Sequence, residues 1–184
     1  MSRYPNFVEV RTRRYKINTD YETALECEKI AKSDISEEER AMAIIYILYS
    51  EEGLNNTEDW EELLQLALKY LNCGKESKNN NEKPNMSFEQ DRSYIEASFF
   101  NDYKIDLEDI KMHWWKFYEL LEGLTEDCVL NRVRFVRDFD ISQIKDRKEK
   151  EKWLKQKAQV ALKREKTVEE KRLDELFEKQ INGG

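Results

Sequence analysis

Hydrophobic and polar positions recur with a helical period along most of the chain, most clearly in residues 87–124. This stretch predicts two helices joined by a tight corner. The first begins with the capping-box pattern at Ser87 and ends near Tyr103, and the second begins at Asp106 and ends at Gly123. The apolar stripe of the second helix consists of Ile110, Trp114, Phe117, Tyr118 and Leu121. Because large aromatic side chains bury ~150–250 Å² each, we expect these helices to pack together or against a third helix and form the core.

The N-terminal region predicts a β-hairpin followed by three helices. Residues 7–10 and 15–17 are short apolar-bearing runs around a basic turn, and such a hairpin must lean on the helices to be stable. The basic turn could face a phosphate, but a solvated turn beside an acidic body explains it more simply. Capping patterns at Thr19, Ser36 and Thr57 predict the starts of three short helices with brief loops, which favour antiparallel neighbours. The second and third of these helices are predicted to end at Gly53 and Gly74.

The C-terminal region is dominated by charge. A helix capped by Thr125 is predicted first, with Val129, Val133 and Val136 facing inward. Residues 138–141 are then an irregular link, and residues 142–181 predict a long polar helix. Its thin apolar stripe begins with Trp153, Leu154, Ala158, Ala161 and Leu162, and continues after a second capping pattern at Thr167 with Leu173, Leu176 and Phe177. A helix this polar is marginal alone, so the stripe either packs back on the body or contacts a partner.

Together these elements predict a mainly α fold, with a compact multi-helix domain, a small N-terminal β-hairpin and a long charged C-terminal helix. The five glycines and two prolines agree with a helical protein. We expect a helical core domain over residues 1–144 and a charged helical extension over residues 145–184. The Asn-rich segment 75–86 is expected to be a flexible insertion within the core domain.

Charge is distributed unevenly between these two parts. The chain has a net charge of −7, with 13 basic and 9 acidic residues in 145–184 and therefore 19 basic and 30 acidic residues in 1–144. An overall acidic chain argues against a general nucleic-acid binder, and the asymmetry hints at self-association or at a charged partner. Three widely spaced cysteines, and the absence of an apolar leader or an 18-residue apolar run, predict a soluble cytoplasmic protein without a membrane span.

The residues suited to catalysis or metal binding have simpler explanations. Asp109 and His113 would lie one helical turn apart, but a capping acid in a first turn accounts for them better than a metal site. A catalytic pairing of His113 with Cys128 would need a third group and a pocket that no motif indicates. Trp114 and Trp115 could stack on a ligand, but their helical spacing favours a core helix covered from both sides. We therefore expect no enzyme activity, no cofactor and no metal.

A set of motifs between residues 88 and 140 resembles a bacteriophage tail assembly chaperone family, found in long-tailed phages and prophages of Gram-positive bacteria. The motifs are FEQD at 88–91, Phe99, Tyr103-x-Ile105-Asp106-Leu107, Met112-His113-Trp114-Trp115-x-Phe117, Leu121-x-Gly123-Leu124 and Arg137-x-x-Asp140. The opening run Tyr15-x-Ile17-x-Thr19-Asp20-Tyr21 is also similar, and the resemblance covers roughly residues 7–160. The core motif residues are Asp91, Phe99, Tyr103, Asp106, His113, Trp114, Trp115, Phe117 and Arg137.

The resemblance implies a chaperone that binds the tape measure protein, recruits major tail protein subunits and leaves the finished virion. Its expected location is then the cytoplasm of the infected or lysogenic host. A virion component, such as a head–tail connector or neck protein, is the alternative. We interpret Asp91, Asp106, His113 and Arg137 as candidates for a buried charge-assisted network. The stripe from Trp153 to Leu162 is the candidate partner-binding face.

Overall fold

The computed structural model describes residues 3–75 and 84–163 and is mainly helical, as predicted. Most of the predicted insertion at 75–86, and the apolar positions expected after residue 163, lie outside the described residues. The elements in chain order are β1 (Phe7–Val10), β2 (Arg13–Lys16), α1 (Tyr21–Ala31), α2 (Glu37–Asn55), a 3₁₀ turn (Thr57–Asp59), α3 (Trp60–Leu71), α4 (Arg92–Tyr103), α5 (Trp114–Glu122), α6 (Val129–Asp138) and α7 (Arg147–Val160).

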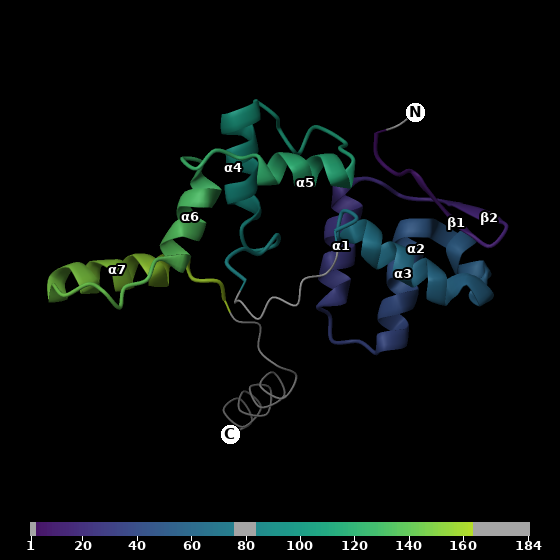
Figure 1. Ribbon diagram of the computed structural model, residues 1–184, viewed down its shortest axis with the longest axis horizontal. Helices are drawn as coiled ribbons and strands as arrows, with labels where there is room; N and C mark the ends of the chain where they lie inside the picture. The colour runs from purple at the N-terminus through teal and green to yellow at the C-terminus, as the bar shows by residue number, and fades with distance from the viewer. Residues whose placement is uncertain (1–2, 76–83, 164–184) are drawn as a thin grey trace, which may run out of the picture.

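The elements are arranged along one long axis (Figure 1). The hairpin and helices α1–α3 form one end, α4 and α5 occupy the middle, and α6 leads to α7 at the opposite end. Helix α1 packs on α2 and α5, whereas α7 packs on α6. Within the described residues, none of the helices combines the length and apolarity needed to cross a bilayer.

The predicted hairpin is present and leans on the helices through a buried carboxylate. Val10 and Tyr15 are fully buried, and the Tyr15 hydroxyl donates to Asp59 Oδ2 at 2.6 Å. Arg13 donates to the same oxygen at 2.9 Å, and Arg11 lies 3.4 Å from Oδ1. The Tyr15 hydrogen bond is the main cause that lowers the pKa of the Asp59 carboxyl, with the two arginines adding to it. Part of the basic turn therefore pairs with a buried acid beside α3.

Local capping signals predicted some helix starts, whereas other helices begin later in the chain than predicted. The capping box of Ser36 and Glu39 is present at the start of α2. At the start of α1, however, the N-cap is Asp20 rather than Thr19, and its carboxylate accepts the Glu22 N–H at 3.0 Å. Helix α2 does not end at Gly53 but continues to Asn55 across a kink at Ser50, where φ is 59° and ψ is −159°.

The aromatic pairs at the centre of the fold come from α1, α4 and α5. Phe117 stacks on Tyr21 with ring centroids 4.7 Å apart and on Phe99 at 5.1 Å. The indole N–H groups of Trp114 and Trp115 donate to the last carbonyls of α3, at Leu71 and Tyr70, each at 2.9 Å. Trp114 and Phe117 are 1 % exposed, so the prediction that this stretch forms the core is confirmed.

The prediction that Asp106 begins the second helix of this stretch is wrong. Asp106 accepts the Glu108 N–H at 3.1 Å in a local turn, and helix α5 begins only at Trp114 with His113 as its N-cap. Residues 112–114 instead pair with residues 19–21: Tyr21 N–H donates to Met112 O, and Trp114 N–H donates to Thr19 O, each at 2.8 Å. This long-range pairing holds the segment extended, so it carries no first helical turn.

The C-terminal helices also differ from the prediction. Helix α6 is capped by the Cys128 thiol, which accepts the Asn131 N–H at 3.4 Å, and not by Thr125. Leu130 and Val133 are its buried residues, whereas Val129 and Val136 are only partly buried. Helix α7 has 14 residues, so within the described part of the chain it is shorter than the predicted polar helix.

Candidate functional site

Helices α6 and α7 enclose an open groove of about 920 Å³ on the side of α6 that faces away from α4. The α6 side of this groove is the helix face opposite Leu130 and Val133, which are buried against the body. Its lining residues are Asn85, Glu126, Asp127, Asn131, Arg132, Arg134, Phe135, Val136, Asp138, Glu149, Lys152, Trp153 and Gln156. We call this feature the α6–α7 groove.

Two aromatic side chains, Phe135 and Trp153, line the groove and form its apolar floor. Trp153 stacks on Phe139, with ring centroids 3.9 Å apart and planes at 10°. Phe139 in turn lies 5.7 Å from Phe135, whose side chain is 60 % exposed. A large exposed ring that packs on a second ring is the type of surface that anchors a partner's apolar side chain.

The rim of the groove is charged with both signs. Four acidic residues and three basic residues line it, namely Glu126, Asp127, Asp138, Glu149, Arg132, Arg134 and Lys152. Arg134 is held in place by hydrogen bonds to Asn85 Oδ1 at 3.2 Å and Asn131 Oδ1 at 3.1 Å. An apolar floor with a mixed-charge rim suits non-covalent binding of an amphipathic surface.

The five residues of the predicted stripe do not form one helical face. Trp153 packs inward on Phe139, whereas Leu154, which is 48 % exposed, and Ala158 lie on the flank of α7 that does not line the groove. Helix α7 ends at Val160, so Ala161 and Leu162 lie beyond it and outside any helix or strand.

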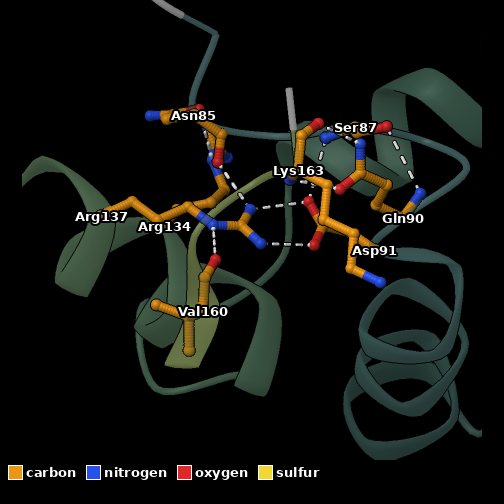
Figure 2. A network of polar contacts seen from close by, with 8 residues as sticks. All are labelled: Asn85, Ser87, Gln90, Asp91, Arg134, Arg137, Val160 and Lys163. Carbon is orange, nitrogen blue, oxygen red and sulfur yellow. Dashed lines mark hydrogen bonds and ion pairs between the residues drawn. The ribbon is translucent and has the colours of Figure 1, made fainter. Parts of the chain in front are cut away.

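A polar network fixes the groove to the rest of the protein (Figure 2). The Arg137 guanidinium donates to both oxygens of Asp91, with two bonds of 2.7 Å. These side chains are 10 % and 1 % exposed, so the pair is buried. Asp91 also accepts the Ser87 N–H at 2.9 Å, and Arg137 donates to the carbonyls of Asn85 and Val160. One arginine therefore joins α6, the chain before α4 and the end of α7.

Two further contacts strengthen this junction. The Lys157 ammonium donates to the carbonyls of Arg137 and Phe139, at 2.6 Å and 2.7 Å, and so caps the C-terminus of α6 from α7. The Gln90 side chain exchanges two hydrogen bonds with the backbone of Lys163, at 3.0 Å and 2.8 Å (Figure 2). The angle between α6 and α7 is thus set by polar contacts at one end of α7.

Of the four polar residues proposed for a buried network, the structure brings together Asp91 and Arg137. Asp106 is exposed in its own turn. His113 lies close to the N-terminal segment of the chain. Its Nδ1 accepts the Trp115 N–H at 3.1 Å, and its Nε2 faces Pro5 O at 3.1 Å. Both ring nitrogens are therefore engaged, and burial lowers the pKa of His113. The Tyr103 hydroxyl donates to Leu120 O at 2.9 Å and joins α4 to α5.

Asp109 and His113 do not lie one helical turn apart in the structure. The helix that would have placed Asp109 one turn before it is not formed, since α5 begins after His113. In the described part of the chain, no three His, Cys, Asp or Glu side chains lie close enough together to hold a metal ion.

The family comparison covers the whole described fold. Residues 2–162 match the family model described as Bacteriophage Gp15 protein. The chain belongs to this family. The Gp15 match includes every helix from α1 to α7, and thus both walls of the α6–α7 groove and the Arg137 network. No curated protein sequence and no solved structure matches the chain significantly.

Sequence reasoning on this Gp15 protein missed Phe135, which lines the groove, and Phe139, which stacks on the groove residue Trp153. The available signal was the position of Phe135 on α6. Leu130 and Val133 mark the inward face of this helix, and Phe135 lies about half a turn away from them, so a large apolar residue faces solvent. The stacking of Phe139 on Trp153 depends on the angle between α6 and α7, which the sequence pattern does not give.

Proposed function

We propose that this Gp15 family protein is a phage tail assembly chaperone that binds the tape measure protein and recruits major tail protein subunits. In this role the protein acts in the cytoplasm of the infected or lysogenic bacterial host and is absent from the mature virion. The observation that carries the proposal is the α6–α7 groove, where exposed Phe135 lies beside the stacked pair of Phe139 and Trp153.

The groove suits a helical partner on physical grounds. An amphipathic helix binds by placing apolar anchors, spaced three or four residues apart, in a groove between two helices. Aromatic residues at the centre of an interface often contribute most of its binding energy, and a polar rim helps to exclude water. Membership of a phage protein family supports a phage partner, and the resemblance to tail assembly chaperones points to the tape measure protein. The proposed role is binding, without catalysis or a cofactor.

The first experiment is co-expression with the tape measure protein of the same gene cluster, followed by a solubility assay and pull-down. We expect the wild-type protein to keep the tape measure soluble and to co-elute with it. Phe135→Asp should abolish this effect because it places a charge on the apolar floor. Phe100→Asp is the matched control, since Phe100 is 57 % exposed on α4 and does not line the groove.

The outcomes separate the proposal from its alternative. A tape measure that stays insoluble with the wild-type protein, or equal behaviour of the two Phe→Asp variants, would contradict the proposal. Mass spectrometry of purified phage particles then tests the alternative, because a connector or neck protein remains in the particle whereas the proposed chaperone does not. Both variants should keep the wild-type circular dichroism spectrum, since both side chains are more than half exposed.

A further inference from the structure

Helix α7 has an outer face that nothing in the described chain covers. The exposed residues Lys148 and Lys155 are seven positions apart and therefore lie on the same side of the helix, with Leu154 and Ala158 beside them. No residue of α7 is buried. A 14-residue helix with this composition is marginal in water by itself, so a covering surface would stabilise it.

The charge of this region is opposite to that of the other end of the protein. Residues 145–163 carry eight basic and three acidic side chains, a net charge of +5. Residues 21–71, which span α1 to α3, carry 13 acidic and four basic side chains, a net charge of −9. Charge complementarity of this size favours association between the two regions at low ionic strength.

The two regions cannot meet within one molecule. Helix α7 and helices α2 and α3 lie at opposite ends of the long axis (Figure 1). We propose that the outer face of α7 binds the acidic α1–α3 region of a second copy of this chain. The resulting contact is head to tail, so each copy offers one basic face and one acidic face to its neighbours. Such a heterologous contact extends into a ring or a filament rather than stopping at a symmetric dimer.

The acidic region presents a receiving surface on α2. Glu38, Met42 and Tyr46 are exposed and lie four residues apart, so they form one stripe along the outer face of this helix. Met42 is 37 % exposed and Tyr46 is 51 % exposed. Leu154 and Ala158 of the neighbouring α7 supply apolar side chains to this stripe, and Lys148 and Lys155 supply charges opposite to Glu38.

This inference goes beyond the proposed chaperone function and does not depend on it. Lys148, Leu154, Lys155 and Ala158 are not among the residues that line the α6–α7 groove. A helical partner in the groove and a second copy on the outer face can therefore bind at the same time. The tape measure experiment and the self-association experiment can fail separately.

The test is the molar mass of the purified full-length chain by light scattering and sedimentation velocity, at about 50 mM and about 500 mM salt, where surface charges are screened to different extents. We expect a mass that rises with concentration above the 22.2 kDa monomer at low salt and returns to the monomer at high salt. The double variant Lys148→Glu/Lys155→Glu should weaken association at least about tenfold, because it replaces attraction with repulsion.

Two further variants make the test specific. Lys111→Glu/Lys116→Glu reverses two exposed lysines outside α7 and should leave association unchanged. Glu37→Lys/Glu38→Lys reverses two acidic residues of α2 and should also weaken association. Mixing this variant with Lys148→Glu/Lys155→Glu should restore association, since each reversed face then meets an opposite charge on the other protein.

Several results would overturn the proposal. One such result is a wild-type chain that remains a monomer at low salt and high concentration, or one whose association does not change with salt. Another is equal association of the α7 variant and the Lys111/Lys116 control, which would show that the contact lies elsewhere. Failure of the two reversed variants to associate on mixing would show that their faces do not meet, provided that each keeps the wild-type circular dichroism spectrum.

Discussion

Replacing Arg137 with alanine leaves the Asp91 carboxylate buried without its ionic partner. Asp91 is 1 % exposed and loses two hydrogen bonds of 2.7 Å, while the carbonyls of Asn85 and Val160 lose a donor. Removing one partner of a buried ion pair costs about 3–5 kcal/mol of stability. Because the Ser87 N–H still donates to Asp91, we expect a loss of about 3 kcal/mol, near the lower limit of that range.

The free energy of unfolding can be measured by urea denaturation followed by circular dichroism. For a chain of this size, ~3 kcal/mol corresponds to a fall in melting temperature of roughly 6–12 °C. Arg132→Ala is the matched control, since Arg132 is exposed on the same helix and should change stability by less than about 0.5 kcal/mol. Combining Arg137→Ala with Asp91→Asn completes a double-mutant cycle, which should give a coupling energy of about 1 kcal/mol or more.

A stabilising role for the Asp91–Arg137 pair would be refuted if Arg137→Ala lost no more stability than Arg132→Ala. It would also be refuted if the two substitutions in the cycle were additive, because independent effects would mean that the two side chains do not stabilise each other. Arg137→Lys gives a finer comparison. Lysine keeps the charge but cannot form the two-bonded geometry with Asp91, so its stability should lie between those of the wild type and Arg137→Ala.

Three further predictions concern pH and backbone strain. Burial lowers the pKa of His113 below the ordinary value of 6.5, so its neutral ring stabilises the fold fully above pH 6.5, and this stability is lost as the pH falls through the lower folded pKa. His113→Asn keeps a capping group but does not titrate in this range. The variant should therefore show a smaller difference between the melting temperatures at about pH 7.5 and about pH 5.5. Tyr15→Phe removes the main cause of the low pKa of Asp59, so NMR titration should show that pKa rising. Ser50 has φ of 59° and ψ of −159°, a region favoured by glycine, and Ser50→Gly should raise the free energy of unfolding by about 1 kcal/mol in urea denaturation.

Local sequence signals predicted those features whose causes are local. The capping box at Ser36 depends on a residue three positions away, and Gly123 lies at the end of α5 as expected. The first hairpin strand was predicted with its observed bounds and the second within two residues, because their short apolar-bearing runs flank a turn. In each case the decisive contacts lie within a few residues along the chain.

The start of α5 could not be predicted in this way. Asp106 is an acceptable N-cap by residue type, but the structure uses it in a turn with Glu108. The position of Trp114 is fixed by backbone hydrogen bonds between residues 112–114 and residues 19–21, more than 90 positions away in sequence. A local pattern contains no information about such a contact.

The candidate binding site was predicted only in part. The sequence indicated Trp153 and Leu154 together, but α7 packs on α6 so that only Trp153 lines the groove. Phe135 becomes prominent only when the angle between these helices creates the groove. That angle depends on Arg137, which contacts three separate segments. Sequence reasoning selected Arg137 and Asp91 as candidates because charged residues amid aromatic motifs need partners, and the structure pairs them.

The stacking of Trp153 on Phe139 has a practical consequence for spectroscopy. Of the four tryptophans, Trp60, Trp114 and Trp115 belong to the body of the protein, and only Trp153 lies on α7. Incorporation of 5-fluorotryptophan would therefore give a fluorine resonance for α7 that is separate from three resonances of the body. Movement of α7, or occupation of the groove beside it, can thus be followed at a natural residue without attaching a label.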